Sequence, residues 1–195
     1  MSMDVTTNKW RNGMTVARGV VVFFTGLPGA GKTTLAKAFA GLLETRGRTV
    51  TLLDGDEIRT WLSNGLGYSR QDRDINILRI GRVAAEVARH GGVAVCAAIA
   101  PYREARARVK SMVQAIGAIY IEVYLSTPIE ICELRDPKGH YRKARGGAVS
   151  GFTGVDDPYE PPLDPVISLD TSKCGVDAAV NVVFEAFART AEARS

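Results

Sequence analysis

Apolar residues in this chain are gathered into five short runs, and longer helix-like segments separate these runs. The runs are nearly continuous and rich in β-branched residues, which is typical of strands covered on both faces. They occupy residues 20–25, 49–53, 93–98, 119–125 and 166–169. The helix-like segments occupy residues 32–46, 55–64, 71–90, 103–116, 128–135 and 176–192. This alternation predicts an α/β fold with a parallel sheet and helices on both of its faces.

The stretch 136–165 follows neither pattern, because it is rich in Gly, Pro and charged residues and contains no strand-like run. A strand-like run comes after it, so we expect a functional loop or lid, at about 136–160, rather than a linker. A length of 195 residues suits one domain with a core of its own. We therefore expect a single domain over 19–195. Residues 1–18 are polar and lack the apolar region of a secretory signal, which predicts a flexible extension.

Composition and charge narrow the classes of partner. The net charge of +4 is compatible with an ordinary solvated surface or with a small anionic substrate. Outside 136–165 the basic residues are scattered and not interleaved with aromatic ones, which argues against nucleic acid. No apolar stretch reaches the ~18 residues that a membrane span needs. The three cysteines, Cys96, Cys132 and Cys174, form no CxxC pair, which favours a reducing, cytoplasmic setting and argues against zinc.

The first predicted strand leads directly into GLPGAGKT, a GxxxxGK[ST] motif that stands between a strand and a helix. Glycines let such a loop turn its N–H groups toward phosphate oxygens, and the helix N-terminus adds partial positive charge. In P-loop proteins the lysine reaches the β- and γ-phosphates, and the hydroxyl that follows it ligates Mg²⁺. We therefore expect ATP and Mg²⁺ to bind at Gly26, Leu27, Pro28, Gly29, Ala30, Gly31, Lys32, Thr33 and Thr34.

The remaining sequence favours a small-molecule kinase among P-loop proteins. The only Asn-Lys pair, at 8–9, precedes the first strand and lacks the Asp of a guanine-specific NKxD element. After the second strand, Asp54 and Asp56 stand where parallel sheets bind their ligands. Two carboxylates there can hold Mg²⁺ or accept a proton from an attacking hydroxyl, although a plain helix cap has the same residues.

The helix predicted at 71–90 carries polar residues on its inward stripe. Arg73 and Asn76 share this stripe with Ile77 and Ile80, so its first turns are polar and its later turns apolar. Such a stripe suits a helix that begins at a binding site and ends in the core. The alternative, in which both polar residues only cap or solvate the start of the helix, stays open on this pattern alone.

Several longer stretches resemble the adenylylsulfate kinase family, P-loop kinases that make 3′-phosphoadenylyl sulfate from adenylyl sulfate and ATP. Besides the P-loop they are LLDGDEIR, LGYSRQDRDIN, IAPYR, EVYLSTPIEICELRDPKGHYRKAR and GFTGVDDPYEPP. Together they span about 26–162, and generic P-loop kinases lack the last two. The resemblance implies Mg²⁺-dependent phosphorylation of the 3′-hydroxyl of adenylyl sulfate by ATP, in sulfate assimilation.

The resemblance also implies roles for individual residues. Beside the roles carried over from the family, the P-loop and acidic motifs lead us to expect that Asp56 accepts the proton or orients the hydroxyl and, with Thr33, holds the metal, and that Lys32 stabilises the transferred charge. Arg135 matches a residue near the ATP base, and the run 141–145 matches the mobile lid. The implied acceptor site contains Asp54, Arg59, Tyr68, Arg73, Asn76, Ile99, Ala100, Lys138, Phe152 and Thr153. In this site the adenine of adenylyl sulfate stacks between the rings at 68 and 152. A homodimer is expected from the family, and a functional link to a separate ATP sulfurylase stays open.

The chain departs from the family pattern at several positions. The family often has Ser, assigned as a phosphoserine, at Ala100, Arg at Leu78, Asn at Glu57, and Glu and Lys at Ala148 and Ser150. These positions lose charge near an anionic acceptor. A second interpretation therefore stays open, in which a kinase of the same fold acts on the 3′-hydroxyl of another nucleotide, such as a modified cytidine diphosphate. A non-catalytic nucleotide-binding module is the third interpretation, against which the intact P-loop argues.

Overall fold

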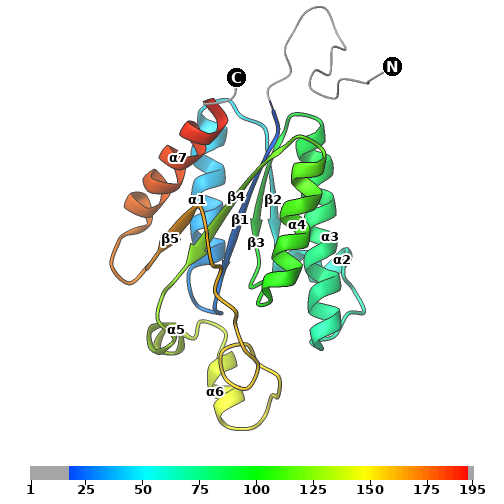
Figure 1. Ribbon diagram of the computed structural model, residues 1–195. Helices are drawn as coiled ribbons and strands as arrows, with labels where there is room; N and C mark the ends of the chain where they lie inside the picture. The colour runs from blue at the N-terminus through cyan, green and yellow to red at the C-terminus, as the bar shows by residue number, and fades with distance from the viewer. Residues whose placement is uncertain (1–17, 193–195) are drawn as a thin grey trace, which may run out of the picture.

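The computed structural model describes residues 18–192, which form a parallel five-stranded sheet between two layers of helices (Figure 1). The strands pair in the order β2-β3-β1-β4-β5. They are β1 (Val20–Gly26), β2 (Val50–Asp54), β3 (Val93–Ala97), β4 (Ile119–Leu125) and β5 (Ile167–Leu169). The predicted α/β fold with a parallel sheet is therefore confirmed. The extension expected at 1–18 lies, except for its last residue, outside the described residues.

Two helices cover each face of the sheet. Helices α1 (Lys32–Thr45) and α7 (Val176–Glu192) pack together on one face, and α3 (Arg70–Arg89) and α4 (Arg103–Ala115) pack together on the other (Figure 1). The central strand β1 explains this arrangement, because its side chains alternate between two apolar cores. Val20, Val22 and Phe24 enter the core beneath α1 and α7, whereas Val21 and Phe23 enter the core beneath α3 and α4. Burial on both faces fixes β1 and therefore fixes the loop that leaves its carboxyl end.

The short helices lie at the carboxyl ends of the strands. Helix α2 (Gly55–Trp61) follows β2 directly, and α5 (Ile129–Arg135) follows β4. Helix α6 (His140–Arg145) falls inside the stretch for which the sequence pattern predicted only a loop. It is only six residues long and buries only Tyr141 and Ala144, so its apolar pattern is too brief to stand out among basic residues. Figure 1 shows α5 and α6 beyond the lower edge of the sheet.

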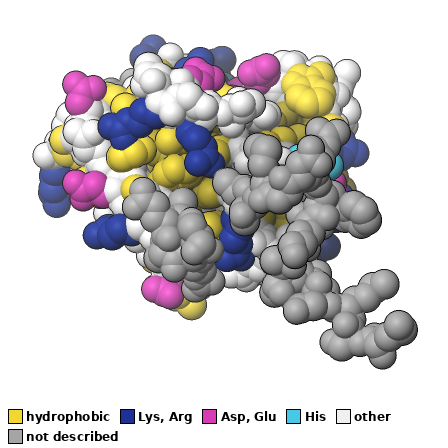
Figure 2. Space-filling model, turned by 90° about the horizontal axis from the view of Figure 1, so that it is seen from above, with side chains coloured by type: hydrophobic (Ala, Val, Ile, Leu, Met, Phe, Trp, Pro, Cys, Tyr) yellow, Lys and Arg dark blue, Asp and Glu magenta, His cyan; other side chains and the backbone are white. Residues whose placement is uncertain are grey.

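The two ends of the described chain lie at the amino ends of the strands, on the side of the sheet away from α5 and α6 (Figure 1). Seen from that side, Figure 2 shows hydrophobic side chains lying between Lys and Arg side chains. On this edge the Arg46 guanidinium lies 3.7 Å from the centre of the Phe184 ring, a cation–π contact. No helix among the described residues is long and apolar enough to cross a membrane.

Candidate active site

The phosphate loop is curled by glycines that adopt backbone angles unfavourable for other residues. Gly29 has a φ of 77°, and a Cβ there would lie 2.8 Å from the carbonyl oxygen of Cys132 in α5. Gly31 has a φ of 95° and is the N-cap of α1. The loop therefore packs against α5 on its outer side and ends at the N-terminus of α1. This is the geometry that directs N–H groups and the partial positive charge of a helix at phosphate.

The Lys32 side chain lies over this loop. Its Nζ donates hydrogen bonds to the carbonyl oxygens of Gly26, at 3.0 Å, and Leu27, at 2.7 Å. Burial lowers the pKa of Lys32 to about 8, and the nearby carboxylates of Asp56 and Asp54 are among the charges that oppose this shift. The ammonium group is thus held in a poorly solvated place at the mouth of the loop, where it interacts strongly with any anion.

The two carboxylates after β2 have different surroundings. Asp54 is only 8% exposed, accepts a hydrogen bond from the Thr33 hydroxyl at 2.7 Å, and caps α2 by accepting from the Asp56 N–H at 3.0 Å. The Asp56 side chain is 70% exposed and forms an ion pair with Lys138, which precedes α6. Asp54 therefore serves both as a helix cap and as the contact to the phosphate loop, while the Asp56 carboxylate is exposed beside Lys138.

The same groups have the chemistry that a magnesium site requires. Hydroxyl and carboxylate oxygens are the donors that Mg²⁺ prefers, and it commonly takes only one or two protein ligands beside phosphate and water. The Thr33 hydroxyl lies 2.7 Å from the Asp54 carboxylate, and Asp56 supplies a second carboxylate two residues later in the first turn of α2. No cluster of three or more Asp, Glu, His or Cys side chains suited to a metal occurs in residues 18–192. The donor set thus fits a magnesium ion that arrives with nucleotide phosphates.

The outer side of the phosphate loop is held by residues from three other segments. Arg135 donates to the carbonyl oxygen of Gly29 at 3.3 Å and to the hydroxyl of Thr171 at 2.7 Å. Thr171, just after β5, donates in turn to the carbonyl oxygen of Ala30 at 3.0 Å. The Tyr141 hydroxyl donates to the carbonyl oxygen of Pro28 at 3.0 Å. Arg135 thus lies beside the phosphate loop, while its implied place near the ATP base stays a prediction, and Thr171 joins it without having been predicted.

Arg73 and Asn76 are buried at the start of α3, which confirms that the polar beginning of its stripe points inward. Arg73 forms an ion pair with Asp157 at 2.8 Å and donates to the hydroxyl of Thr153 and to the carbonyl oxygen of Gly151. Asn76 is 4% exposed, and its Oδ1 accepts no hydrogen bond from the described residues. A buried amide oxygen without a donor is unusual and suits a group that binds a ligand.

Two aromatic rings from distant parts of the chain complete this side. Tyr68 is 70% exposed, and the Arg59 guanidinium lies 4.6 Å from its ring centre. Phe152 packs edge-on against Tyr141, with ring centres 5.0 Å apart. Phe152 and Arg73 belong to one cluster, because Arg73 binds the residues on both sides of Phe152.

Comparison with known proteins agrees with this geometry. The model of the family described as adenylylsulphate kinase matches residues 18–170. The chain is 48% identical to a curated adenylyl-sulfate kinase from Synechococcus over 168 residues, which is 86% of this chain and 94% of the relative. This chain belongs to the adenylylsulphate kinase family. The family fold extends to solved structures. A Mycobacterium tuberculosis APS kinase in complex with AMPPNP and APS has a TM-score of 0.85 and 38% identity, over 87% of this chain and 98% of that one.

A second solved member of the family is described as a hexameric APS kinase from Thiobacillus denitrificans. It has a TM-score of 0.67 and 39% identity, and the match covers 88% of this chain but only 29% of that one. The family domain therefore also occurs within a much longer chain.

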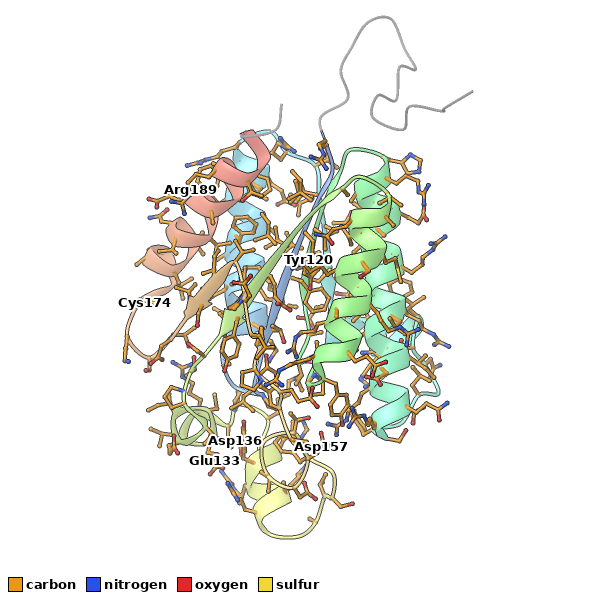
Figure 3. The ribbon with its side chains drawn as sticks, in the orientation of Figure 1. Tyr120, Glu133, Asp136, Asp157, Cys174 and Arg189 are labelled. Atoms are coloured by element: carbon orange, nitrogen blue, oxygen red, sulfur yellow. The ribbon has the colours of Figure 1, made fainter. Side chains whose placement is uncertain are left out.

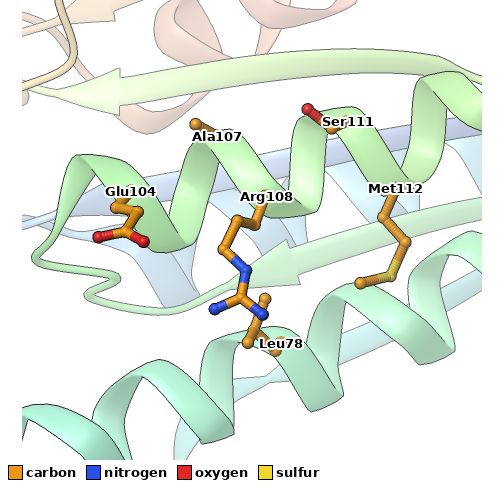
Figure 4. Close-up of a pocket in the computed structure, with 6 residues that line it drawn as sticks. All are labelled: Leu78, Glu104, Ala107, Arg108, Ser111 and Met112. Atoms are coloured by element: carbon orange, nitrogen blue, oxygen red, sulfur yellow. The ribbon is translucent and has the colours of Figure 1, made fainter.

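The departures from the adenylylsulfate kinase pattern fall at different distances from the site. Leu78 lines a groove between the outer faces of α3 and α4, together with Glu104, Arg108 and Met112 (Figure 4). Ala148 and Ser150 are exposed residues between α6 and Gly151. Glu57 directly follows Asp56 in the first turn of α2, and Ala100 follows Ile99, whose carbonyl accepts from the N–H of Gly26 at 3.5 Å.

The sequence patterns missed several residues that this family member uses to build the site. Asp157 accepts hydrogen bonds from the Tyr102 hydroxyl at 2.8 and 3.0 Å as well as pairing with Arg73. Figure 3 places Asp157 at the carboxyl end of the sheet, near the start of α4. Asp157 lies within the quoted GFTGVDDPYEPP stretch, but its two partners are 55 and 84 residues away in the chain. Local periodicity carries no information about such contacts.

Proposed function

We propose that this chain transfers the γ-phosphate of ATP to the 3′-hydroxyl of adenylyl sulfate and so makes 3′-phosphoadenylyl sulfate. The observation that carries the proposal is one arrangement at the carboxyl edge of the sheet. There Tyr141 joins the two sides, because its hydroxyl donates to the P-loop and its ring packs on Phe152. The buried Arg73 binds the residues on both sides of Phe152, and Asn76 is buried beside it on α3. The overall likeness to an APS kinase solved with AMPPNP and APS supports the same reading.

On the donor side, the residues 26–34 hold the phosphates of ATP, and Arg135 lies near its base. Thr33 and Asp56 hold Mg²⁺, which when bound neutralises charge on the phosphates. The buried Asp54 fixes the Thr33 hydroxyl through the 2.7 Å hydrogen bond between them. Lys32 adds positive charge where the loose transition state concentrates negative charge.

On the acceptor side, Arg59, Arg73 and Asn76 bind the phosphosulfate and sugar, and Tyr68 and Phe152 stack on the adenine. Asp54, Ile99, Ala100 and Thr153 border the same space. Asp56 is the group with an accessible carboxylate at the cleft, so it accepts the proton of the attacking 3′-hydroxyl or orients that hydroxyl. Positioning of the two nucleotides, rather than covalent catalysis, then supplies most of the rate.

Residues 136–160 serve as a lid over both nucleotides in this proposal. Lys138 contacts Asp56 from one end of the segment, and Thr153 contacts Arg73 from the other. The segment therefore touches the donor side and the acceptor side at once. Its basic residues, Lys138 and the 141–145 run, offset the repulsion between several anionic groups in one cleft.

The proposal also covers the extent of the domain, its compartment, its oligomeric state and its functional partner. Residues 19–195 act as a single catalytic domain, in a cytoplasmic homodimer, with a functional link to a separate ATP sulfurylase. One solved relative is described as hexameric, so the oligomeric state of this chain should be measured directly.

A panel of acceptors tests the proposal against its rivals. ADP release is measured with adenylyl sulfate, with cytidine diphosphate derivatives and with other nucleotides at equal concentration. We expect turnover with adenylyl sulfate to exceed all others at least about tenfold, since a buried site rejects groups that leave its polar atoms unpaired. Preference for another nucleotide would support the second interpretation, and binding of ATP without turnover of any acceptor would support a non-catalytic module.

A further inference from the structure

Arg106 of α4 links two segments that border the proposed acceptor site. Its side chain is 3% exposed. Nη1 donates to the carbonyl oxygen of Ala100 at 2.5 Å, and Nη2 donates to the carbonyl oxygen of Glu160 at 2.5 Å. Nε pairs with the carboxylate of Glu122 in β4 at 3.2 Å. All three nitrogens of this buried guanidinium therefore have a partner. Two of these partners are backbone carbonyl groups in segments far apart in the chain.

The first of these segments is the loop that follows β3. The Ile99 carbonyl accepts from the Thr25 hydroxyl at 2.7 Å, at the end of β1, and from the first N–H of the phosphate loop. Ala100 has a φ of 46°, in the left-handed region that residues with a side chain rarely occupy. Its carbonyl direction depends on this unusual conformation, and Arg106 donates to that same carbonyl.

The second segment is the end of the 136–160 region and the residues just after it. Tyr159 stacks on Tyr124 of β4, with ring centres 5.9 Å apart, and its hydroxyl lies 2.9 Å from that of Thr25. The Glu160 N–H donates to the carbonyl oxygen of Pro101 at 2.8 Å. The Arg106 guanidinium also lies 5.5 Å from the Tyr159 ring centre. The two segments thus touch each other and share Arg106 as their common support.

We propose that Arg106 is a positioning residue for the acceptor, because it sets the loop 99–101 and the segment 159–161 relative to the phosphate loop. The inference rests on the proposed function for the identity of the acceptor. Arginine suits this task because its planar fork donates in several fixed directions at once, which the single ammonium group of lysine cannot reproduce. A small displacement of either segment would move the acceptor away from its line of attack.

Arg106→Lys tests the proposal, and Arg108→Lys is the matched control because Arg108 is exposed on the same helix. Amide hydrogen exchange, which needs no substrate, is followed at Glu160 and at Gly26. We expect at least about tenfold faster exchange at Glu160 in Arg106→Lys and no change in the control. In kinetics, the KM for adenylyl sulfate should rise about tenfold or more while the KM for ATP stays within about twofold.

A second pair of variants separates positioning from stability. Glu122→Gln keeps both bonds from Arg106 to the backbone carbonyls, so the KM for adenylyl sulfate should stay near that of the wild type. Arg106→Gln leaves an amide that reaches at most one carbonyl and should resemble Arg106→Lys. Unchanged exchange at Glu160 in folded Arg106→Lys, an equal rise in both KM values, or failure of both Arg106 variants to fold would overturn the proposal. A wild type that does not use adenylyl sulfate would contradict the proposed function instead, and the exchange measurement would still decide the role of Arg106.

Discussion

The hydroxyl of Thr33 and the carboxylate of Asp54 are joined by a 2.7 Å hydrogen bond between the start of α1 and the end of β2. Because Asp54 also caps α2, its position is fixed by two independent contacts. Asp56 is two residues further on and has an exposed side chain paired only with Lys138 among the described residues. The two acidic residues that look equivalent in the sequence therefore have separable tasks.

Substitution of each acidic residue by the amide should separate these tasks. Asp56→Asn should lower kcat on the order of 10²–10⁴, because it removes the proposed proton acceptor, and should change ATP affinity far less. Asp54→Asn keeps a capping side chain, since Asn caps as well as Asp, but weakens the support of Thr33. We expect it to raise the Mg²⁺ concentration that half-saturates the enzyme. Steady-state kinetics over a range of Mg²⁺ checks both, and a larger loss of kcat in Asp54→Asn would reverse the assignment.

Lys32→Met should stabilise the free protein near neutral pH while removing activity. The folded pKa of Lys32, about 8, lies below its ordinary value of 10.5, so between these pH values the unfolded chain holds the additional proton. The free energy of unfolding of the wild type therefore rises with pH across this window. At about pH 7 the variant should be more stable by about 1–3 kcal/mol, and the gap should narrow toward pH 10.5.

Urea unfolding of both proteins at several pH values measures this gap, with Lys37→Met as the control, because Lys37 is exposed on the same helix. The loss of kcat in Lys32→Met should be on the order of 10²–10³, by comparison with other groups that stabilise transition-state charge. A stability gap that stays constant with pH would show that the ammonium group is well solvated in the folded protein.

Phe152→Ala should weaken binding of adenylyl sulfate by roughly 1–3 kcal/mol, the range for loss of one base–aromatic stack. ATP affinity should change little, because Phe152 lies on the turn that Arg73 holds and the Tyr141 hydroxyl stays in place to donate to the phosphate loop. Phe152→Tyr keeps the flat ring and should retain most of the affinity. Calorimetric titration with each nucleotide provides the measurement, and a collapse of ATP affinity would move Phe152 to the donor site.

Phosphoryl transfer should be direct, without a phosphorylated enzyme. Ala100 carries only a methyl group where the family often has a serine, and it is 1% exposed. The phosphate loop, both carboxylates and the acceptor cluster are all present, and they are sufficient for in-line attack. Initial-rate plots should intersect, as for a ternary complex, and γ-labelled ATP alone should leave no stoichiometric label on the protein. Parallel lines together with a trapped phosphoenzyme would require another nucleophile, such as Ser69 or Thr153.

The sequence predicted the sheet and the phosphate loop well, because both depend on local patterns. The five apolar runs are all strands in the structure, and Gly29 and Gly31 take the left-handed angles that the motif needs. The pairing of Thr33 with Asp54, the role of Thr171 and the contacts of Asp157 were not predictable in this way. Each of them joins segments distant in the chain, and their geometry is decided by how the helices pack on the sheet.

The start of β1 and the last turn of α7 both lie at the end of the sheet opposite the phosphate loop (Figure 1). An affinity tag, a fluorescent protein or a surface linker attached directly before β1 or directly after α7 would therefore begin on the side of the molecule away from the phosphate loop. Immobilisation through a linker at either of these two points should leave substrate access intact. The same placement gives a geometric reason why this domain can exist inside a longer polypeptide without obstruction of its catalytic face.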